Sequence, residues 1–164
     1  MSISAWNVHG LGDKMNDDMF INKISSDINI LLETWTGADP KVNLQDYNSI
    51  SKCRKKKKRN QGDTVEVSSY YTKKYLSDGI TYIKNATSSE NMLWLKLDKN
   101  IFGLDSDLYI GAIYVPPISS NHYDNDFEIL ETEIRALSNQ GKILLIGDFN
   151  SLTGKNPHYI LQDY

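Results

Sequence analysis

The chain has 164 residues, a formal net charge of −3, 40% hydrophobic residues and 24% charged residues. This length and composition predict one globular domain with a buried core, and exclude a disordered or collagen-like chain. Cys53 is the only cysteine, which excludes an internal disulfide and a thiolate metal cluster. No apolar signal core or membrane-spanning stretch is visible, so we expect an intracellular protein that is not secreted and has no membrane partner.

The first half of the chain predicts strands alternating with one helix. Residues 2–7 are expected to form a strand, and Gly10-Leu11-Gly12 a turn. Residues 16–26 have helical apolar spacing, with Asn16 as the expected N-cap. Further strands are expected at residues 29–34 and 47–51.

The second half predicts more strands and one longer helix. Strands are expected at residues 82–84, 92–97, 108–115 and 142–147, the third stopped by Pro116-Pro117. Residues 126–139 carry Phe127, Leu130, Ile134 and Leu137 at helical spacing, which predicts one buried face, and Gly141 is expected to end this helix. Helices mixed with apolar strands indicate an α/β layered fold.

Four strands are followed by polar or aromatic residues at the points where they end. The four motifs are Trp6-Asn7-Val8-His9-Gly10-Leu11, Leu32-Glu33-Thr34-Trp35, Ile113-Tyr114-Val115-Pro116-Pro117 and Gly147-Asp148-Phe149-Asn150. Functional sites in sheet proteins gather at strand ends, where loops meet over a rigid base. Each residue alone is more typical of a turn, and it is the four motifs in this order that indicate a site.

The last motif predicts a pair of side chains on one face. In extended backbone, Asp148 and Asn150 point the same way while Phe149 points into the core. A carboxylate beside an amide can activate a water and hold a phosphate oxygen. Glu33 offers the hard oxygen ligand that Mg²⁺ prefers. Asn7 can orient that carboxylate or touch the phosphate, and Tyr114 can donate a hydrogen bond to the phosphate.

With these four motifs the chain resembles the endonuclease/exonuclease/phosphatase superfamily, and more narrowly the apurinic-type endonuclease domain of LINE-type retrotransposons. The resemblance runs through nearly the whole chain. It implies a deoxyribonuclease-I-like fold, a four-layer α/β sandwich that would be incomplete at its C-terminus here. It also implies DNA as the partner, a nuclear location, and a monomer or part of a larger retroelement polyprotein.

The resemblance implies metal-assisted attack of water on a phosphodiester. Glu33 would bind Mg²⁺ (or Mn²⁺), with Asn7 assisting at the metal and the phosphate. Tyr114 would contact the scissile phosphate, Asp148 would orient or deprotonate the water, and Asn150 would stabilise the developing charge.

Two features depart from the pattern of that superfamily. Residues 1–164 contain no Ser-Asp-His motif of the kind that handles proton transfer, since His9, His122 and His158 lie in other contexts. We therefore expect a single partial domain without activity as it stands. Residues 64–70, Thr-Val-Glu-Val-Ser-Ser-Tyr, replace a Ser-Gly-Gly-Val-type run. A local frameshift would explain them, and we expect residues 64–69 to pack poorly.

A basic run leaves three alternatives open. Residues 52–59 are mostly cationic, and the cluster Lys55, Lys56, Lys57, Lys58 and Arg59 is a candidate for contacts with the DNA backbone. The run is equally compatible with a solvated loop or a nuclear address.

Two other functions stay open beside the endonuclease. One is a phosphoesterase of another branch of the superfamily, of the sphingomyelinase or inositol-phosphatase type. The other is a non-catalytic retroelement remnant with weak nucleic-acid binding, which the basic run and the missing His motif favour.

Overall fold

The structure is a computed structural model that describes residues 1–35, 44–55, 64–83, 89–117, 120, 123 and 125–150, without the side chains of residues 54, 55 and 64–67. Its strands are β1 (Ile3–Asn7), β2 (Ile28–Leu32), β3 (Tyr47–Lys55), β4 (Thr64–Lys73), β5 (Ile80–Tyr82), β6 (Met92–Leu97), β7 (Leu108–Tyr114) and β8 (Lys142–Asp148). Its helices are α1 (Asp18–Lys23), α2 (Lys99–Phe102), α3 (Asp126–Ser138) and the short 3-10 helices η1 (Gly12–Asn16) and η2 (Lys74–Gly79).

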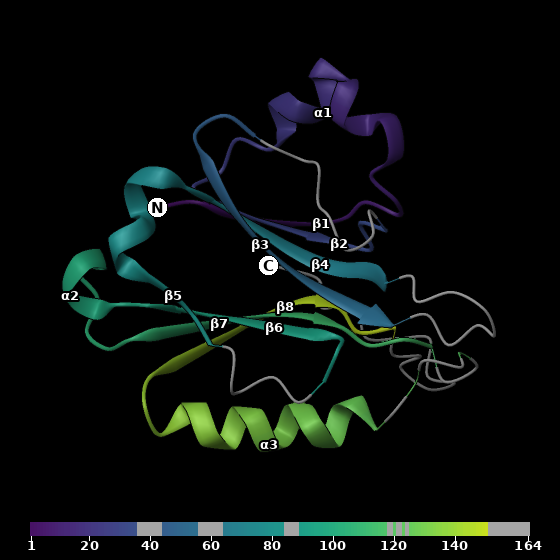
Figure 1. Ribbon diagram of the computed structural model, residues 1–164. Helices are drawn as coiled ribbons and strands as arrows, with labels where there is room; N and C mark the ends of the chain where they lie inside the picture. Colours follow the sequence, from purple (N-terminus) through teal and green to yellow (C-terminus); the bar gives the residue numbers. More distant parts are fainter. Residues whose placement is uncertain are drawn as a thin grey trace, which may run out of the picture.

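Two four-stranded sheets stack face to face, with α1 outside one and α3 outside the other (Figure 1). The strand orders are β1-β2-β4-β3 and β5-β6-β7-β8. β1 runs parallel to β2, and β7 runs parallel to β8. The predicted four-layer α/β sandwich is therefore confirmed.

The innermost core follows from alternation along the strands. Side chains two residues apart point to the same face, and one face of each sheet supplies a shared layer between the sheets. Its fully buried members are Ile28, Ile30, Leu32, Tyr70, Leu93, Leu95, Leu97, Ile110 and Ala112. The Tyr70 hydroxyl donates a hydrogen bond to the Ile110 carbonyl at 2.7 Å, with the Leu93 carbonyl at 3.2 Å, and this contact ties the two sheets together.

The outer faces of the sheets bury the helices. Phe20 of α1 and the adjoining Ile24 pack on Leu31 and Tyr71 of the first sheet. Leu130 and Leu137 of α3 pack on the second sheet, where Trp94 lies fully buried. Each sheet therefore has apolar residues on both faces, as strands in the middle layers of a four-layer fold require.

The buried face of α3 differs from the predicted one. Phe127 is 44% exposed, whereas Asp126 and Glu133 are buried beside Leu130 and Leu137. At 100° per residue, positions 126, 130, 133 and 137 share one side of a helix, and Phe127 falls about a quarter turn away. The two buried acids are paired: Glu133 Oε2 accepts a hydrogen bond of 2.7 Å from Trp94 Nε1, and Asp126 Oδ1 accepts from Ser89 and Asn91.

Two predicted helix boundaries are also wrong. Residues 16–26 hold only α1, and Asp17 rather than Asn16 is its N-cap, because the Asp17 side chain accepts a hydrogen bond from the Met19 backbone. Gly141 does not end α3 through a left-handed backbone. A Cβ there would lie 2.2 Å from the Asp107 carbonyl oxygen, so glycine allows the close approach of β8 to the chain before β7.

The predicted basic loop begins inside a strand. β3 continues from the expected strand to Lys55 and pairs with β4, and their register shifts between Lys52 and Cys53. Lys52 is half-buried, and this loss of solvent lowers the pKa of its ammonium group. Lys56, Lys57, Lys58 and Arg59, and the side chain of Lys55, lie outside the described residues.

The unusual segment of residues 64–70 forms the first part of β4, which pairs with β2 as well as β3. Ser68 and Ser69 are buried between the neighbouring strands. The Ser68 hydroxyl has no hydrogen-bond partner among the described residues. Within the described residues, no helix is both long enough and apolar enough to cross a membrane.

Candidate active site

Parallel pairing brings the four predicted motifs to one end of the sandwich. The register places Asn7 beside Leu32 in one sheet and Tyr114 beside Asp148 in the other. Paired parallel strands end at the same edge of a sheet. The residues that follow each pair therefore lie close together at that edge. β1 and β8 are the edge strands of their sheets, and they face each other across the sandwich.

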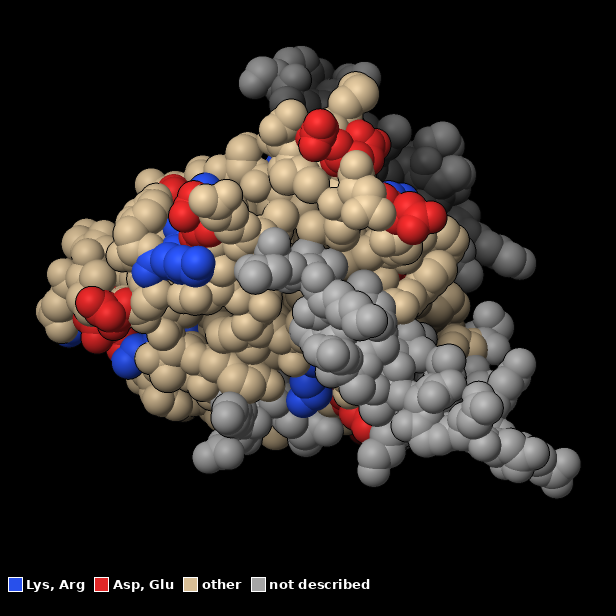
Figure 2. All heavy atoms as spheres, turned by 45° about the horizontal axis from the view of Figure 1, so that its top comes forward, with Lys and Arg blue, Asp and Glu red and all other residues tan. Residues whose placement is uncertain are grey.

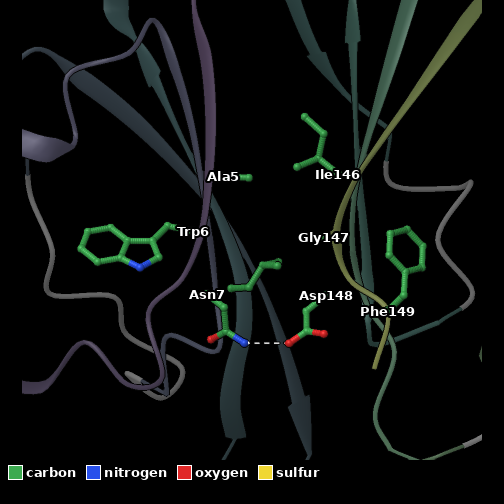
Figure 3. A pocket seen from close by; sticks show the side chains of 8 residues that line it. Ala5, Trp6, Asn7, Ile146, Gly147, Asp148 and Phe149 are labelled. Atoms are coloured by element: carbon green, nitrogen blue, oxygen red, sulfur yellow. Dashed lines mark hydrogen bonds between the residues drawn. The ribbon is translucent and has the colours of Figure 1, made fainter. Parts of the chain in front are cut away.

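One amide joins the two sheets at this end. Asn7 Nδ2 donates a hydrogen bond to Glu33 Oε1 at 3.1 Å and another to Asp148 Oδ2 at 2.9 Å. Figure 3 shows the second bond crossing the gap between β1 and β8. An amide nitrogen has two hydrogens, so Asn7 can hold both carboxylates with its donors fully used.

The carboxylate of Glu33 is positioned by a strained connection. β2 ends at Leu32, and Glu33 has a left-handed φ of 53°. Its backbone carbonyl accepts a hydrogen bond of 2.6 Å from Gly10, and Thr34 accepts one of 2.8 Å from Leu11. A non-glycine residue in this conformation costs free energy, and such strain is concentrated at functional sites.

Asn150 does not share a face with Asp148 in the way the sequence predicted. β8 ends at Asp148, and Asn150 has a φ of 39°, so the extended-backbone argument stops there. The backbone N–H of Asn150 donates to Asp148 Oδ1 at 3.0 Å, and its Nδ2 donates to the Val115 carbonyl at 3.1 Å. Asn150 thus braces Asp148 and the end of β7. Phe149 does pack into the core under α3, as predicted.

Tyr114 lies beside Asp148 in the register of β7 and β8. It continues the alternation of Ile110 and Ala112, which places it on the inner face of the sheet. It is buried, and its backbone N–H donates to the Asn91 carbonyl at 3.0 Å. The carboxyl end of β7 therefore lies next to Asp148.

A cavity of about 320 Å³ lies between the edge strands and opens at this site. It is lined by Ala5, Trp6, Asn7, Leu32, Ile146, Gly147, Asp148 and Phe149. In Figure 3, the rings of Trp6 and Phe149 extend away from the gap, while Asn7 and Asp148 point into it. The polar end of the cavity is therefore made by the same amide and carboxylate.

The donor set at this end fits a hard divalent cation. Glu33 and Asp148 supply two carboxylates, and no described Lys or Arg forms an ion pair with either. The described residues contain no group of three or more His, Cys, Asp and Glu side chains that could hold a metal. Mg²⁺ commonly binds through one or two carboxylates and keeps several waters, so this pair is sufficient.

Two further side chains, His9 and Trp35, belong to this end. His9 Nδ1 lies 3.2 Å from Glu33 Oε2, and its ring meets the Trp35 ring with centroids 4.5 Å apart. The sequence does hint at their place in the site, since both residues lie inside the strand-end motifs. His122 and His158 lie outside the described residues.

The described charges on one face of the molecule are mixed in sign. On the face shown in Figure 2, the described basic and acidic side chains form small neighbouring groups, and neither sign covers that face. The described part of this face therefore has no broad cationic field of the kind that binds nucleic acid without a specific site.

Comparisons with known proteins identify the fold. No protein-family model and no curated protein sequence matches the chain. The catalytic domain of APE2 from Xenopus laevis matches with a TM-score of 0.64 at 15% identity, over 92% of this chain and 59% of that one. An endonuclease/exonuclease/phosphatase family protein from Leptotrichia buccalis matches with a TM-score of 0.56 at 13% identity, over 91% of this chain and 66% of that one.

A third structure, an endonuclease/exonuclease/phosphatase from Beutenbergia cavernae, matches with a TM-score of 0.53 at 14% identity, over 93% of this chain and 48% of that one. The chain thus spans about half to two-thirds of the length of these structures. With its two stacked mixed sheets between helices, the chain has the deoxyribonuclease-I-like fold of the endonuclease/exonuclease/phosphatase proteins.

Proposed function

We propose that this end of the sandwich is the site of a divalent-metal-dependent phosphodiesterase that nicks DNA. The observation that carries the proposal is the Asn7 amide, which holds Glu33 and Asp148 together from two different sheets. Two carboxylates gathered around one amide, with no Lys or Arg paired to them among the described residues, are arranged for a metal ion and a phosphate. The fold shared with the APE2 catalytic domain supports the same class of reaction.

Each side chain has a distinct task in this proposal. Glu33 holds the ion, Mg²⁺ or Mn²⁺, which when bound supplies Lewis-acid polarisation of the phosphate. Asp148 orients the attacking water and accepts its proton. Asn7 keeps the two carboxylates at their separation, and the Tyr114 hydroxyl donates to a phosphate oxygen. Asn150 stabilises developing charge through the second hydrogen of its Nδ2, because the first is donated to the Val115 carbonyl.

The finer assignment rests on the sequence motifs. We propose a LINE-type retrotransposon endonuclease as the origin of the chain, supported by the Ile113-Tyr114-Val115-Pro116-Pro117 motif, with DNA as partner and the nucleus as its place of action. Residues 1–164 contain no Ser-Asp-His motif to handle the proton. The level of activity of residues 1–164 is therefore itself a quantity to measure.

The test is a nicking assay on supercoiled plasmid. Purified protein is incubated with plasmid in Mg²⁺, in Mn²⁺ and in excess EDTA, and the relaxed form is quantified on a gel. Because residues 1–164 lack the Ser-Asp-His motif, we expect nicking to be absent or slow. Any nicking that occurs is expected in both metals and not in EDTA, because the carboxylates alone cannot polarise a phosphate.

Nicking that survives EDTA would contradict the metal-dependent mechanism. Background levels under all three conditions would contradict hydrolysis by this chain and favour the non-catalytic remnant. Hydrolysis of sphingomyelin without nicking of plasmid would favour a sphingomyelinase-type phosphoesterase over a DNA-nicking enzyme.

A further inference from the structure

Trp35 and His9 form an exposed pair of rings beside Glu33. Trp35 is 46% exposed, the His9 side chain is 79% exposed, and the two rings meet at 62° with centroids 4.5 Å apart. Tryptophan is highly buried on average, so the exposed fraction of Trp35 is unusual. Trp6 is also partly exposed, but its ring packs on Phe20 and lies under the Lys23 ammonium group.

The backbone holds this ring pair at a cost. His9 has a φ of 45° and Trp35 a φ of 54°, both in the left-handed region, where a bulky residue such as tryptophan is an outlier. Strain of this kind persists where the surroundings force it, and it is concentrated at functional positions. The backbone that carries the ring pair is therefore held by its surroundings.

A glycine makes the arrangement possible. Gly10 has a φ of 85°, and a Cβ there would lie 2.9 Å from Trp35 Cε3, so the indole lies directly against the Gly10 backbone. On either side of this contact, Gly10 donates to the Glu33 carbonyl and Leu11 to the Thr34 carbonyl. These bonds fix the indole relative to Glu33, which is two residues away in the chain.

Resting on the phosphodiesterase function proposed above, we propose that Trp35, with His9 at its edge, stacks a nucleobase of the strand whose phosphate binds at Glu33 and Asp148. Aromatic rings bind any base through its flat face, with little dependence on sequence. A rigid indole fixed beside the phosphate site suits a planar base. A lipid-binding surface would instead be a wider apolar patch, and here the neighbouring ring is a polar imidazole in contact with a carboxylate.

The experiment compares two labelled single-stranded oligonucleotides of the same length by fluorescence anisotropy. One carries ordinary bases, and in the other the central nucleotides are abasic sugar-phosphate spacers. Ca²⁺ replaces Mg²⁺ to limit cleavage. We expect the wild type to bind the base-containing strand roughly tenfold more tightly than the abasic strand.

Three variants locate the effect. Trp35→Ala is expected to erase the preference for bases, and Trp35→Phe to keep most of it. Phe127→Ala, which removes a comparably exposed ring from α3, is expected to leave it unchanged. Thermal melting of each variant, together with the retained preference of Trp35→Phe, separates lost stacking from lost folding.

The outcomes separate this inference from the proposed function. Equal binding of both strands by the wild type, or a preference that survives Trp35→Ala, would overturn stacking while leaving the phosphodiesterase site intact. Binding of neither strand would contradict DNA as the substrate, and stacking with it. A Trp35→Ala variant that loses binding to sphingomyelin vesicles but keeps its preference for bases would assign the ring pair to a membrane instead.

Discussion

Asp148→Ala is expected to lower metal-dependent nicking on the order of 1,000-fold, a size typical of losing a general base or water-orienting group. Asp148 is the group that faces both the Asn7 amide and, through its other oxygen, the Asn150 backbone. Its loss removes one of two carboxylates from the site and the proposed acceptor of the proton from water. The rate is measured as relaxed plasmid formed per unit time in Mg²⁺.

The matched control is Asp105→Ala. The Asp105 side chain is 95% exposed and lies 3.6 Å from Lys142, so it is a carboxylate with no part in the site. We expect wild-type nicking from this variant. If both variants lose nicking, the loss is not specific to Asp148. If neither variant loses nicking, Asp148 takes no part in the reaction.

Asp148→Ala has a second expected consequence, for stability. Two carboxylates held close with no described Lys or Arg beside them repel each other, so removing one is expected to leave the free energy of unfolding unchanged or slightly higher. A functional site that costs stability behaves this way. If the Asp148→Ala variant is inactive but melts at the wild-type temperature, its loss of nicking comes from the missing carboxylate and not from unfolding.

Gly147→Ala is expected to destabilise the protein by about 3 kcal/mol, at the upper end of the usual cost of overpacking. A Cβ at position 147 would lie 1.8 Å from the Ile113 carbonyl oxygen and 2.9 Å from its nitrogen. These are backbone atoms of the paired strand, which a side-chain rotation cannot move away. β8 must therefore shift from β7, and Asp148, the next residue, shifts with it.

The measurement is chemical denaturation, with Gly103→Ala as control. Gly103 ends α2 with a φ of 63°, and a Cβ there would meet nothing within 4 Å. That substitution should cost only the left-handed conformation, about 1 kcal/mol. Equal destabilisation by the two substitutions would mean that the close approach of β8 to β7 is not required.

The sequence predicted which strand ends lie together better than it predicted the boundaries of the elements around them. Asn7, Glu33 and Asp148 each lie at or just after the end of an apolar strand, and parallel pairing brings such ends together. The two hydrogen bonds from the Asn7 amide to Glu33 and Asp148 could not be predicted, because they depend on how the two sheets are stacked. Asn150 was misplaced since its left-handed backbone is a local departure that period-two reasoning cannot detect.

The errors in the fold have a common cause. Phe127 was assigned to the core because apolar residues are usually buried, whereas α3 buries Glu133 against the Trp94 indole N–H. A buried acid with a dedicated donor is stable, but only the tertiary structure provides that donor. The β3–β4 pairing was missed for a related reason, because charged and serine-rich strands carry a weak apolar signal.

Residues 1–164 should bind one Mn²⁺ per chain at the Asn7–Glu33–Asp148 cluster, and this is the most direct test of a metal-dependent site. Electron paramagnetic resonance of free Mn²⁺ during titration measures the binding without requiring activity. We expect Glu33→Gln to abolish this binding, since it removes a carboxylate charge while keeping the side-chain shape, and Asp105→Asn to leave it intact. Equal Mn²⁺ binding by the wild type and Glu33→Gln would contradict the metal site, and with it the proposed chemistry.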